Sequence, residues 1–456
     1  MEEDETRTDG DLVLTKKSLF TVLEAIAMGL VPVGCKDPPP APPPPYTSGV
    51  QLTLEDSGVT EAWLKLKFTD ASIPRTFSLE RDGYTTLSGT LVGQDTVLVD
   101  TGMAPGASYT YKAFRLIGTA RIDSSAPLQI ITMDTTNHSI TWELDTLGVA
   151  FSMLEDIAIL NDTLAFAVGE MYLRDSTGQL DPRLYNLAVW NGDTWSIRRV
   201  PYYYGGIPYY YPIEGVFAFG SNDVWLCGGG LSHWDGNAYT EVPIPSSVWG
   251  QSLMKRIWGI SSSQIYVVGT NGSAAYFDGG TWQQIQTGTT LDFYDIWGSR
   301  NRNGQWEILA LASIFSSQTQ ESAIVEMVGN SATPVDVTGL SADMGAIWSV
   351  PGKAYYAVGA GIHRKRSLSD SAWVVYPPGV VTSNVSWGVR GVDINDVFVM
   401  GSFGEVVHFN GVNWHSYFPP HYLPTGGLGP VAVTKHLVIA VGDIGGNRGA
   451  ALIGRR

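Results

Sequence analysis

The chain from residue 138 to residue 456 repeats one pattern of apolar and polar positions. In each unit an apolar anchor is followed twelve positions later by a glycine, and successive units are mostly about 40 to 45 residues apart. The anchor and glycine pairs are Ile157/Gly169, Val216/Gly228, Ile257/Gly269, Ile347/Gly359, Val389/Gly401 and Pro430/Gly442. A further unit begins at Ile296, with the additional residues NRNG before its second strand. This period is typical of four-stranded blades, so the pattern predicts a seven-bladed β-propeller.

Within a unit the alternation predicts four short strands, as in MKRIWGISSSQIYVVGTNGSAAYFDGGTWQQIQT. The third and fourth strands are separated by Asn-Gly or Asp-Gly, dipeptides that accept the positive φ angles of tight hairpins. An aromatic residue follows each of these glycines by three positions, at Trp195, Tyr239, Trp282 and Trp414. A periodic aromatic residue predicts periodic packing, so we expect these side chains to lie between adjacent blades.

The two ends of the repeat array predict how the ring closes. After Gly442 the last unit has only NRGAALIGRR, which provides a third strand but no fourth. The segment HSITWELDTLG, from His138 to Gly148, has the pattern of a fourth strand but precedes the first unit. We therefore expect it to be the outer strand of the last blade, which removes the open edges of a linear array.

Residues 49–134 show a different pattern, with strands that alternate over short runs and end at Gly, Pro or Asp. This pattern predicts a β-sandwich. The segment resembles a fibronectin type III domain at Trp63, at LERDG (79–83) and at PGASYTY (105–111). The resemblance implies a role as a spacer or in protein contact, and it implies that the tyrosines in the last motif are structural.

The repeats themselves, with SNDVWLCG, INDVFVMG and HWDG, resemble those of bacterial secreted and surface propellers, a family loosely described as kelch-like or BNR-like. The resemblance implies the fold and leaves the function open, because propellers carry many unrelated activities.

The N-terminal region differs from both domains. Residues 1–35 combine an acidic leader with KKSLFTVLEAIAMGLVPVGC, which resembles a bacterial lipoprotein signal with Cys35 as the lipidated residue. The alternative is a short amphipathic helix. Residues 36–48 begin with a proline-rich run that predicts a stiff spacer. The sequence therefore predicts a protein that is lipid-anchored in a bacterial cell envelope, at the surface or in the periplasm, or secreted, with the anchor as its only membrane contact.

Composition excludes some classes of function. The net charge is −16 at pH 7, and residues 1–12 alone hold six acidic residues and one arginine. This balance makes nucleic acid an unsuitable partner. With only two cysteines in the chain, Cys35 and Cys227, no disulfide framework is expected.

The longest loops are predicted on one face of the ring. Connections from second to third strands, and from each blade to the next, emerge on the same side, and these include EMYLRDSTGQLDPR, PYYYGGIPYYYP, SIFSSQTQES and FPPHYLPTGGLG. Binding residues concentrate on loops held by a rigid scaffold. We therefore predict that this face binds a glycan or a protein through Tyr202, Tyr203, Tyr204, Tyr209, Tyr210, Tyr211, His421 and Tyr422. The alternative is that the tyrosines pack on a neighbouring blade or mediate self-association.

No constellation typical of catalysis stands out, and the sequence predicts no cofactor and no metal site. Arg256 and Arg390 occupy equivalent positions beside first strands, which favours a structural role in the repeat. His233 and His408 are likewise equivalent, and His408 and His415 have no third ligand at a convincing spacing. The leading hypothesis is therefore a non-enzymatic, envelope-tethered binding protein. The alternatives are a glycan-active enzyme that uses the same face and a scaffold in an envelope complex.

Overall fold

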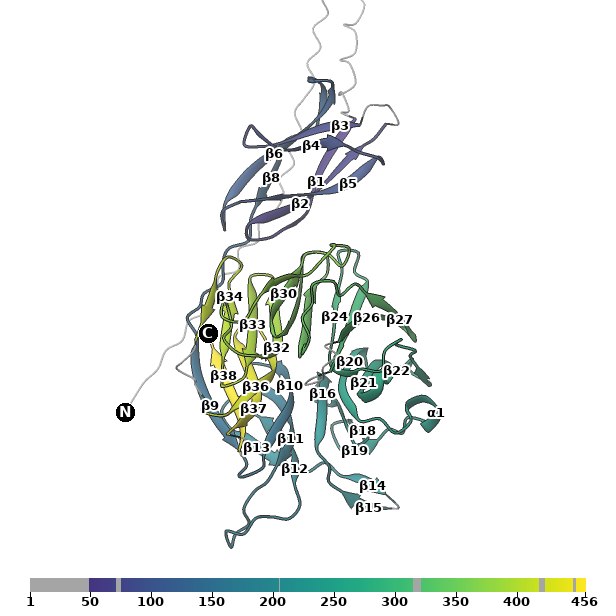
Figure 1. Ribbon diagram of the computed structural model, residues 1–456, viewed down its shortest axis with the longest axis vertical. Helices are drawn as coiled ribbons and strands as arrows, with labels where there is room; N and C mark the ends of the chain where they lie inside the picture. Colours follow the sequence, from purple (N-terminus) through teal and green to yellow (C-terminus); the bar gives the residue numbers. More distant parts are fainter. Residues whose placement is uncertain (1–48, 71–74, 205, 315–320, 418–422, 446–447) are drawn as a thin grey trace, which may run out of the picture. The chain divides into compact units, whose positions relative to one another are not determined.

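The computed structural model describes residues 49–70, 75–204, 206–314, 321–417, 423–445 and 448–456. Almost all of its regular structure is β, and its strands form antiparallel sheets (Figure 1). The only helices in this part of the chain are the four-residue α1 (Ser246–Trp249) and the single 3₁₀ turn η1 (Thr270–Gly272). No helix among these residues is long and apolar enough to span a bilayer.

The first two sheets form the region predicted as a sandwich. One sheet has the order β1 (Val50–Ser57), β2 (Glu61–Phe68), β5 (Asp95–Thr101), and the other β4 (Tyr84–Thr90), β3 (Thr76–Arg81), β6 (Ser108–Ile117), β7 (Ala120–Ser124), with β8 (Leu128–Ile131) also paired to β6. Leu64, Leu66 and Leu79 are fully buried in their shared core. Tyr109 accepts a hydrogen bond from the Ala104 amide at 2.7 Å, as expected of a structural tyrosine. The assignment to the fibronectin type III family stays a prediction.

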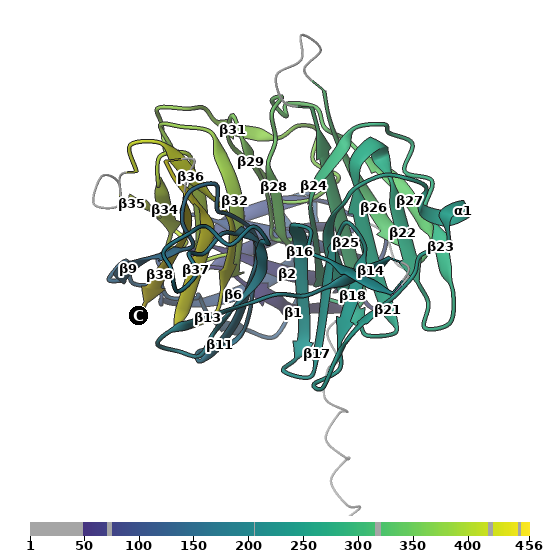
Figure 2. The same cartoon turned by 90° about the horizontal axis from the view of Figure 1, so that it is seen from below.

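All but two of the remaining strands form seven four-stranded sheets, and Figure 2 shows these sheets arranged in a circle. Blade 1 consists of β10 (Met153–Asn161), β11 (Leu164–Met171), β12 (Tyr185–Trp190) and β13 (Trp195–Arg198). Blade 2 consists of β16 (Ile213–Gly220), β17 (Asp223–Gly228), β18 (Leu231–Trp234) and β19 (Tyr239–Glu241). Blade 3 consists of β20 (Met254–Ser261), β21 (Gln264–Gly269), β22 (Ala274–Phe277) and β23 (Trp282–Gln284). Blade 4 consists of β24 (Asp292–Arg300), β25 (Trp306–Ser313), β26 (Ser322–Val328) and β27 (Ser331–Val335).

Blade 5 consists of β28 (Ala346–Val350), β29 (Ala354–Gly359), β30 (Gly361–Lys365) and β31 (Val374–Tyr376). Blade 6 consists of β32 (Ser386–Asp393), β33 (Asp396–Gly401), β34 (Val406–Phe409) and β35 (Trp414–Ser416). Blade 7 combines β36 (Gly426–Val433), β37 (Leu437–Ile444) and β38 (Arg448–Arg455) with β9 (Thr141–Leu147). The prediction of an all-β chain with a ring of four-stranded units is confirmed.

The ring is closed by β9, as the sequence pattern predicts. This strand pairs along its whole length with β38, from Leu147 opposite Gly449 to Thr141 opposite Arg455. Leu147 is buried in a core cluster that contains residues of both blade 1 and blade 7. The first and last blades therefore share an apolar core, like other neighbouring blades in the ring.

The glycine that marks each repeat is required by a close main-chain approach. A Cβ atom on Gly269 would lie 2.0 Å from the carbonyl oxygen of Leu253, and one on Gly359 would lie 2.1 Å from that of Asp343. No side chain fits at such distances, so the end of the second strand can pass the start of the first only at glycine. The periodic aromatic residues pack between blades, because Trp195, Tyr239, Trp282 and Trp414 each contact a cluster shared with the preceding blade.

The loops between second and third strands, and between blades, share one end of the ring because neighbouring strands are antiparallel. We call this end the long-loop face. It includes the hairpin of β14 (Tyr202–Tyr204) and β15 (Ile207–Tyr209), which lies between β13 and β16, and also α1 and η1. Contacts from the first domain reach turns at the opposite end, as in the ion pairs of Asp56 with Lys353 and Glu61 with Arg366.

Deleting residues 138–146 removes almost all of β9, so we expect the whole ring to lose stability and the midpoint of thermal unfolding to fall. The reason is that blade 7 then exposes an unpaired edge and the core between blades 1 and 7 loses its cover. Differential scanning calorimetry checks this. An unchanged melting temperature would contradict closure by this strand.

Candidate binding face and central channel

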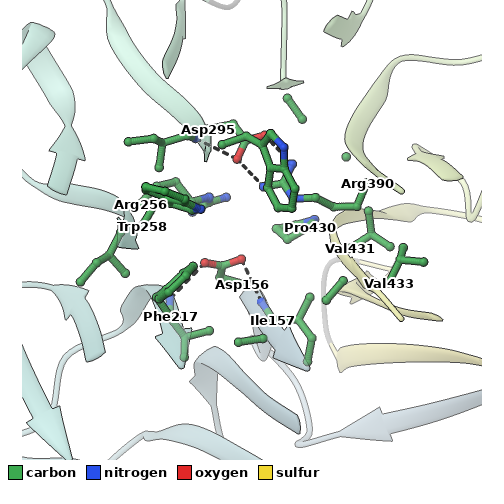
Figure 3. A pocket seen from close by; sticks show the side chains of 18 of the residues that line it. Asp156, Ile157, Phe217, Arg256, Trp258, Asp295, Arg390, Pro430, Val431 and Val433 are labelled. Carbon is green, nitrogen blue, oxygen red and sulfur yellow. Dashed lines mark hydrogen bonds and ion pairs between the residues drawn. The ribbon is translucent and has the colours of Figure 1, made fainter. Parts of the chain in front are cut away.

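The innermost strands of all seven blades enclose a central cavity of about 260 Å³. Its wall consists largely of small and apolar residues, with Asp156, Arg256, Asp295 and Arg390 as the charged groups among its lining side chains. Figure 3 shows these four side chains pointing toward the same cavity. A water molecule occupies about 30 Å³ in the liquid, so the space suits a small number of waters or one or two amino-acid side chains.

Asp295 and Arg390 join three consecutive blades. The guanidinium of Arg390 donates to both carboxylate oxygens of Asp295, at 2.8 and 2.7 Å. Asp295 also accepts from the amides of Ile296 and Ile347 at 2.9 Å, and Arg390 donates to the carbonyl of Ile347 at 3.1 Å. Blades 4, 5 and 6 are thus held in register by one largely buried ion pair, whose two members also bond to main-chain groups.

Asp156 and Arg256 repeat this geometry on blades 1, 2 and 3. Asp156 accepts from the amides of Ile157 at 2.9 Å and Val216 at 3.0 Å, and Arg256 donates to the carbonyl of Glu214 at 2.7 Å. Among the described residues, however, no carboxylate lies within 4.0 Å of the Arg256 guanidinium as Asp295 does for Arg390, although the charge of Asp156 acts on Arg256 from further away. Burial raises the pKa of Asp156, whereas the charge of Arg256 lowers it less strongly. Asp156 and Arg256 therefore both face the cavity but do not form an ion pair with each other.

The mouth of the channel on the long-loop face is acidic beside blades 1 and 2. Glu155 and Glu214 begin the first strands of these blades, and Glu170 lies near the end of β11. Burial raises the pKa of Glu155, and the nearby charge of Glu214 raises it further. Burial likewise raises the pKa of Glu170, although its hydrogen bond from Tyr172 opposes the shift. Lys255, at 2.8 Å from Glu214, compensates part of this charge.

The tyrosine segment forms a two-stranded hairpin with side chains in different environments. Tyr202 is only 5% exposed and packs in the core between blades 1 and 2. Tyr203, Tyr209 and Tyr211 are 53%, 39% and 49% exposed, and the rings of Tyr209 and Tyr211 stack at 6.2 Å. Tyr210 is partly buried near the guanidinium of Arg199, with 5.8 Å between that group and the ring centre. The packing alternative therefore applies to Tyr202, and the exposed tyrosines are available to a ligand.

Two residues that the sequence did not indicate hold the base of this segment. Asn186 is fully buried on β12, where its side-chain amide donates to the carbonyls of Val200 at 2.9 Å and Tyr211 at 3.0 Å. Arg199 forms an ion pair with Asp181 and donates to the carbonyl of Leu184 at 3.2 Å. Both loops of blade 1 are thus fixed to each other. Only the spatial neighbourhood of these residues reveals this role.

The other predicted site residues have different outcomes. Tyr204 belongs to β14, where it pairs with Ile207. Cys35, His421 and Tyr422 lie outside the described residues, so lipidation and a contribution from the second aromatic loop stay predictions. Cys227 is fully buried on β17, and burial raises the pKa of its thiol. In the described part of the chain, no cluster of three His, Cys, Asp or Glu side chains is arranged to hold a metal ion.

Further apolar side chains are exposed on the long-loop face. Phe151 and Met153 lie at the start of blade 1, and Leu253 lies just before the first strand of blade 3. Leu180 and Phe403 lie in the loops between the second and third strands of blades 1 and 6. Phe151 has a φ of 72°, a left-handed conformation that is costly for a phenylalanine. Exposed apolar side chains also lie in turns at the opposite end, such as Val328, Val392 and Val412, so exposure by itself does not distinguish the long-loop face.

No protein-family model matches the chain. No curated protein matches it either. Among solved structures, one described as YCF48 bound to D1 peptide is 15% identical, with a TM-score of 0.51, over 69% of this chain and 94% of that chain. YCF48 from Cyanidioschyzon merolae is 13% identical, with a TM-score of 0.49, over 68% of this chain and 98% of that chain. A quinonprotein alcohol dehydrogenase-like protein from Bacteroides thetaiotaomicron is 9% identical, with a TM-score of 0.33, over 79% and 92% of the two chains.

The fold and the arrangement of the channel define a β-propeller protein. Its fold is similar to that of YCF48, and at this sequence identity the similarity extends to the fold alone.

Asp295→Asn should lower the free energy of unfolding by about 3 to 5 kcal/mol, because it leaves the charge of Arg390 buried without its partner. Asp156→Asn is the matched control and should cost less, since Asp156 forms no ion pair. Urea denaturation followed by tryptophan fluorescence measures both. Equal losses for the two variants would show that the ion pair adds nothing to the hydrogen bonds that both aspartates share.

Proposed function

We propose that this chain is a non-enzymatic binding protein that holds a segment of a partner protein on its long-loop face. The observation that carries the proposal is the aromatic hairpin, whose base is fixed by Asn186 while Tyr203, Tyr209 and Tyr211 remain exposed. Rigid, exposed tyrosines provide a large contact area at a small cost in conformational entropy.

Two features favour a protein segment over a glycan. The cavity of about 260 Å³ accommodates one or two side chains of an inserted segment and is small for an oligosaccharide. In addition, the similar fold of YCF48 has been solved with a D1 peptide, which supports a peptide ligand for this ring. The acidic mouth formed by Glu155, Glu170 and Glu214 favours a partner segment with a basic residue near its contact point.

The N-terminal region supports a display role for this binding domain. A lipid on Cys35 and the proline-rich spacer would place the two β domains at a distance from a membrane of the bacterial envelope. A scaffold in an envelope complex uses the same surface and differs only in the number of partners that it joins.

The combined substitution of Tyr203 and Tyr209 by alanine should weaken binding by tenfold or more, because aromatic anchors dominate the energy of such contacts. Peptides selected from a displayed random library against the wild-type ring provide the probe, and a glycan array is screened in parallel. Tyr84→Ala is the matched control, since this tyrosine is exposed on β4 in the other domain. The proposal fails if the double substitution weakens the binding of none of the selected peptides. If glycans bind and this binding is lost in the double variant, the ligand is a glycan and not a protein segment.

A glycan-active enzyme is the second candidate, and one observation favours it. Burial and the neighbouring Glu214 raise the pKa of Glu155 at the channel mouth, and glycosidases use a pair of carboxyl groups in which one is protonated.

Under this alternative, Glu155→Gln should lower kcat by about 100-fold or more, because it removes the proton donor. Activity should also fall as the pH rises through the raised pKa of Glu155, since the acid must be protonated. Release of reducing ends from a panel of bacterial surface glycans measures this. The absence of any hydrolysis, or full activity in the variant, would remove the candidate.

A further inference from the structure

A cluster of three histidines lies where the chain enters the closing strand. His138 lies three positions before β9, whereas His408 and His415 are paired across the hairpin of β34 and β35 in blade 6. The Nδ1 atoms of His138 and His408 are 2.8 Å apart. The ring centres of His138 and His415 are 4.9 Å apart. The segment that completes blade 7 is thus attached to blade 6 through imidazole rings.

The hydrogen bond between the two Nδ1 atoms requires that at least one ring is neutral. Nε2 of His408 faces the carboxylate of Asp396 at 3.0 Å and therefore carries a proton. In the neutral ring, Nδ1 of His408 is then an acceptor, and Nδ1 of His138 donates to it. If one ring gains a proton, the other ring can still accept at Nδ1 in its Nε2–H tautomer, so the contact survives. When both rings are protonated, two N–H donors face each other at 2.8 Å, and this breaks the contact.

The surroundings cannot neutralise an added positive charge. Asp396 is the carboxylate in contact with His408, and it is already paired with Arg456 just beyond β38, at 2.7 Å from one guanidinium nitrogen. Thr136, His415 and Phe398 also contact the two rings, with Phe398 stacked on His408 at 4.4 Å between ring centres. The hydroxyl of Tyr417 donates to the carbonyl of His138 at 2.7 Å. His408 and Asp396 are buried. None of these groups supplies a second negative charge.

We propose that His138, His408 and His415 form an acid-sensitive latch, in which the contact of His138 with His408 holds the closing segment on blade 6 and is lost when both of these rings are protonated. This latch does not depend on what the long-loop face binds. It acts on the seam of the ring, because loss of the contact frees the residues that lead directly into β9.

The direction of the pH effect follows from the burial of the rings. Burial, together with the neighbouring histidines, lowers the pKa of His138 to about 4, and burial also lowers the pKa of His408. The unfolded chain has ordinary histidines with a pKa of about 6.5 and takes up these protons first. The stabilisation is therefore complete above about pH 6.5 and declines as the pH falls toward 4.

Two measurements on the full chain test the latch. In wild type, the unfolding equilibrium constant should rise by up to about tenfold per pH unit for each of His138 and His408 between pH 6.5 and 4.5. Hydrogen exchange between pH 7.5 and 5.0, corrected for intrinsic rates, should show a loss of protection in Thr141–Leu147 that is larger than in Gln264–Gly269. His138→Gln keeps a hydrogen-bonding side chain that cannot become charged. This variant should reduce both acid effects.

His233→Gln is the matched control. His233 has the same place in blade 2 and the same type of partner, Asp223 at 2.8 Å, and it packs on Trp225 as His408 packs on Phe398. Among the described residues, however, no second histidine ring contacts it. Its substitution should leave the acid dependence unchanged. The proposal is overturned if His138→Gln retains the wild-type dependence on pH, or if β9 remains equally protected at both pH values. His415→Gln, which removes the third ring, should reproduce a smaller part of the same effect.

Discussion

The pairing of β9 with β38 is the interaction on which the rest of the structure depends. An array of seven sheets that contact only their neighbours would otherwise expose an unpaired edge at one end and an apolar face at the other. With Leu147 placed between blades 1 and 7, this seam acquires an apolar cluster like those at other blade boundaries. The channel, the two faces and the positions of the loops all follow from this closed ring.

Polar side chains then fix the parts of the ring that apolar packing leaves undetermined. Asp295 and Arg390 bond to main-chain groups of three blades, and Asp156 and Arg256 do the same on the other side of the channel. Apolar clusters tolerate small sliding movements between blades, whereas a bidentate ion pair is directional. The second set differs because Arg256 bonds to main-chain carbonyls and forms no ion pair with a carboxylate among the described residues, although the charge of Asp156 acts on it.

The long-loop face combines rigidity with exposure. Asn186 and Arg199 hold the tyrosine segment at its base, so the exposed rings are presented by a fixed hairpin and not by a free loop. Acidic groups at the channel mouth lie on the same face, where they select partners by charge while the aromatic rings supply contact area. The histidine cluster lies elsewhere, on the segment that closes the ring, and therefore concerns the integrity of the scaffold.

The sequence by itself determined the blade period, the closing strand and the face that carries the tyrosines, because glycines and aromatic residues at fixed spacing reflect contacts within one repeat or between adjacent repeats. Gly269 and Gly359 show the reason, since each passes a carbonyl oxygen too closely for any side chain. Only the tertiary structure decided that Tyr202 is buried, that Asn186 fixes the hairpin, and that Asp295 meets Arg390. It also brought His138 to His408, which lies 270 residues away. These contacts join residues with no fixed separation along the chain, and their chemistry emerges only when the closed ring places them together.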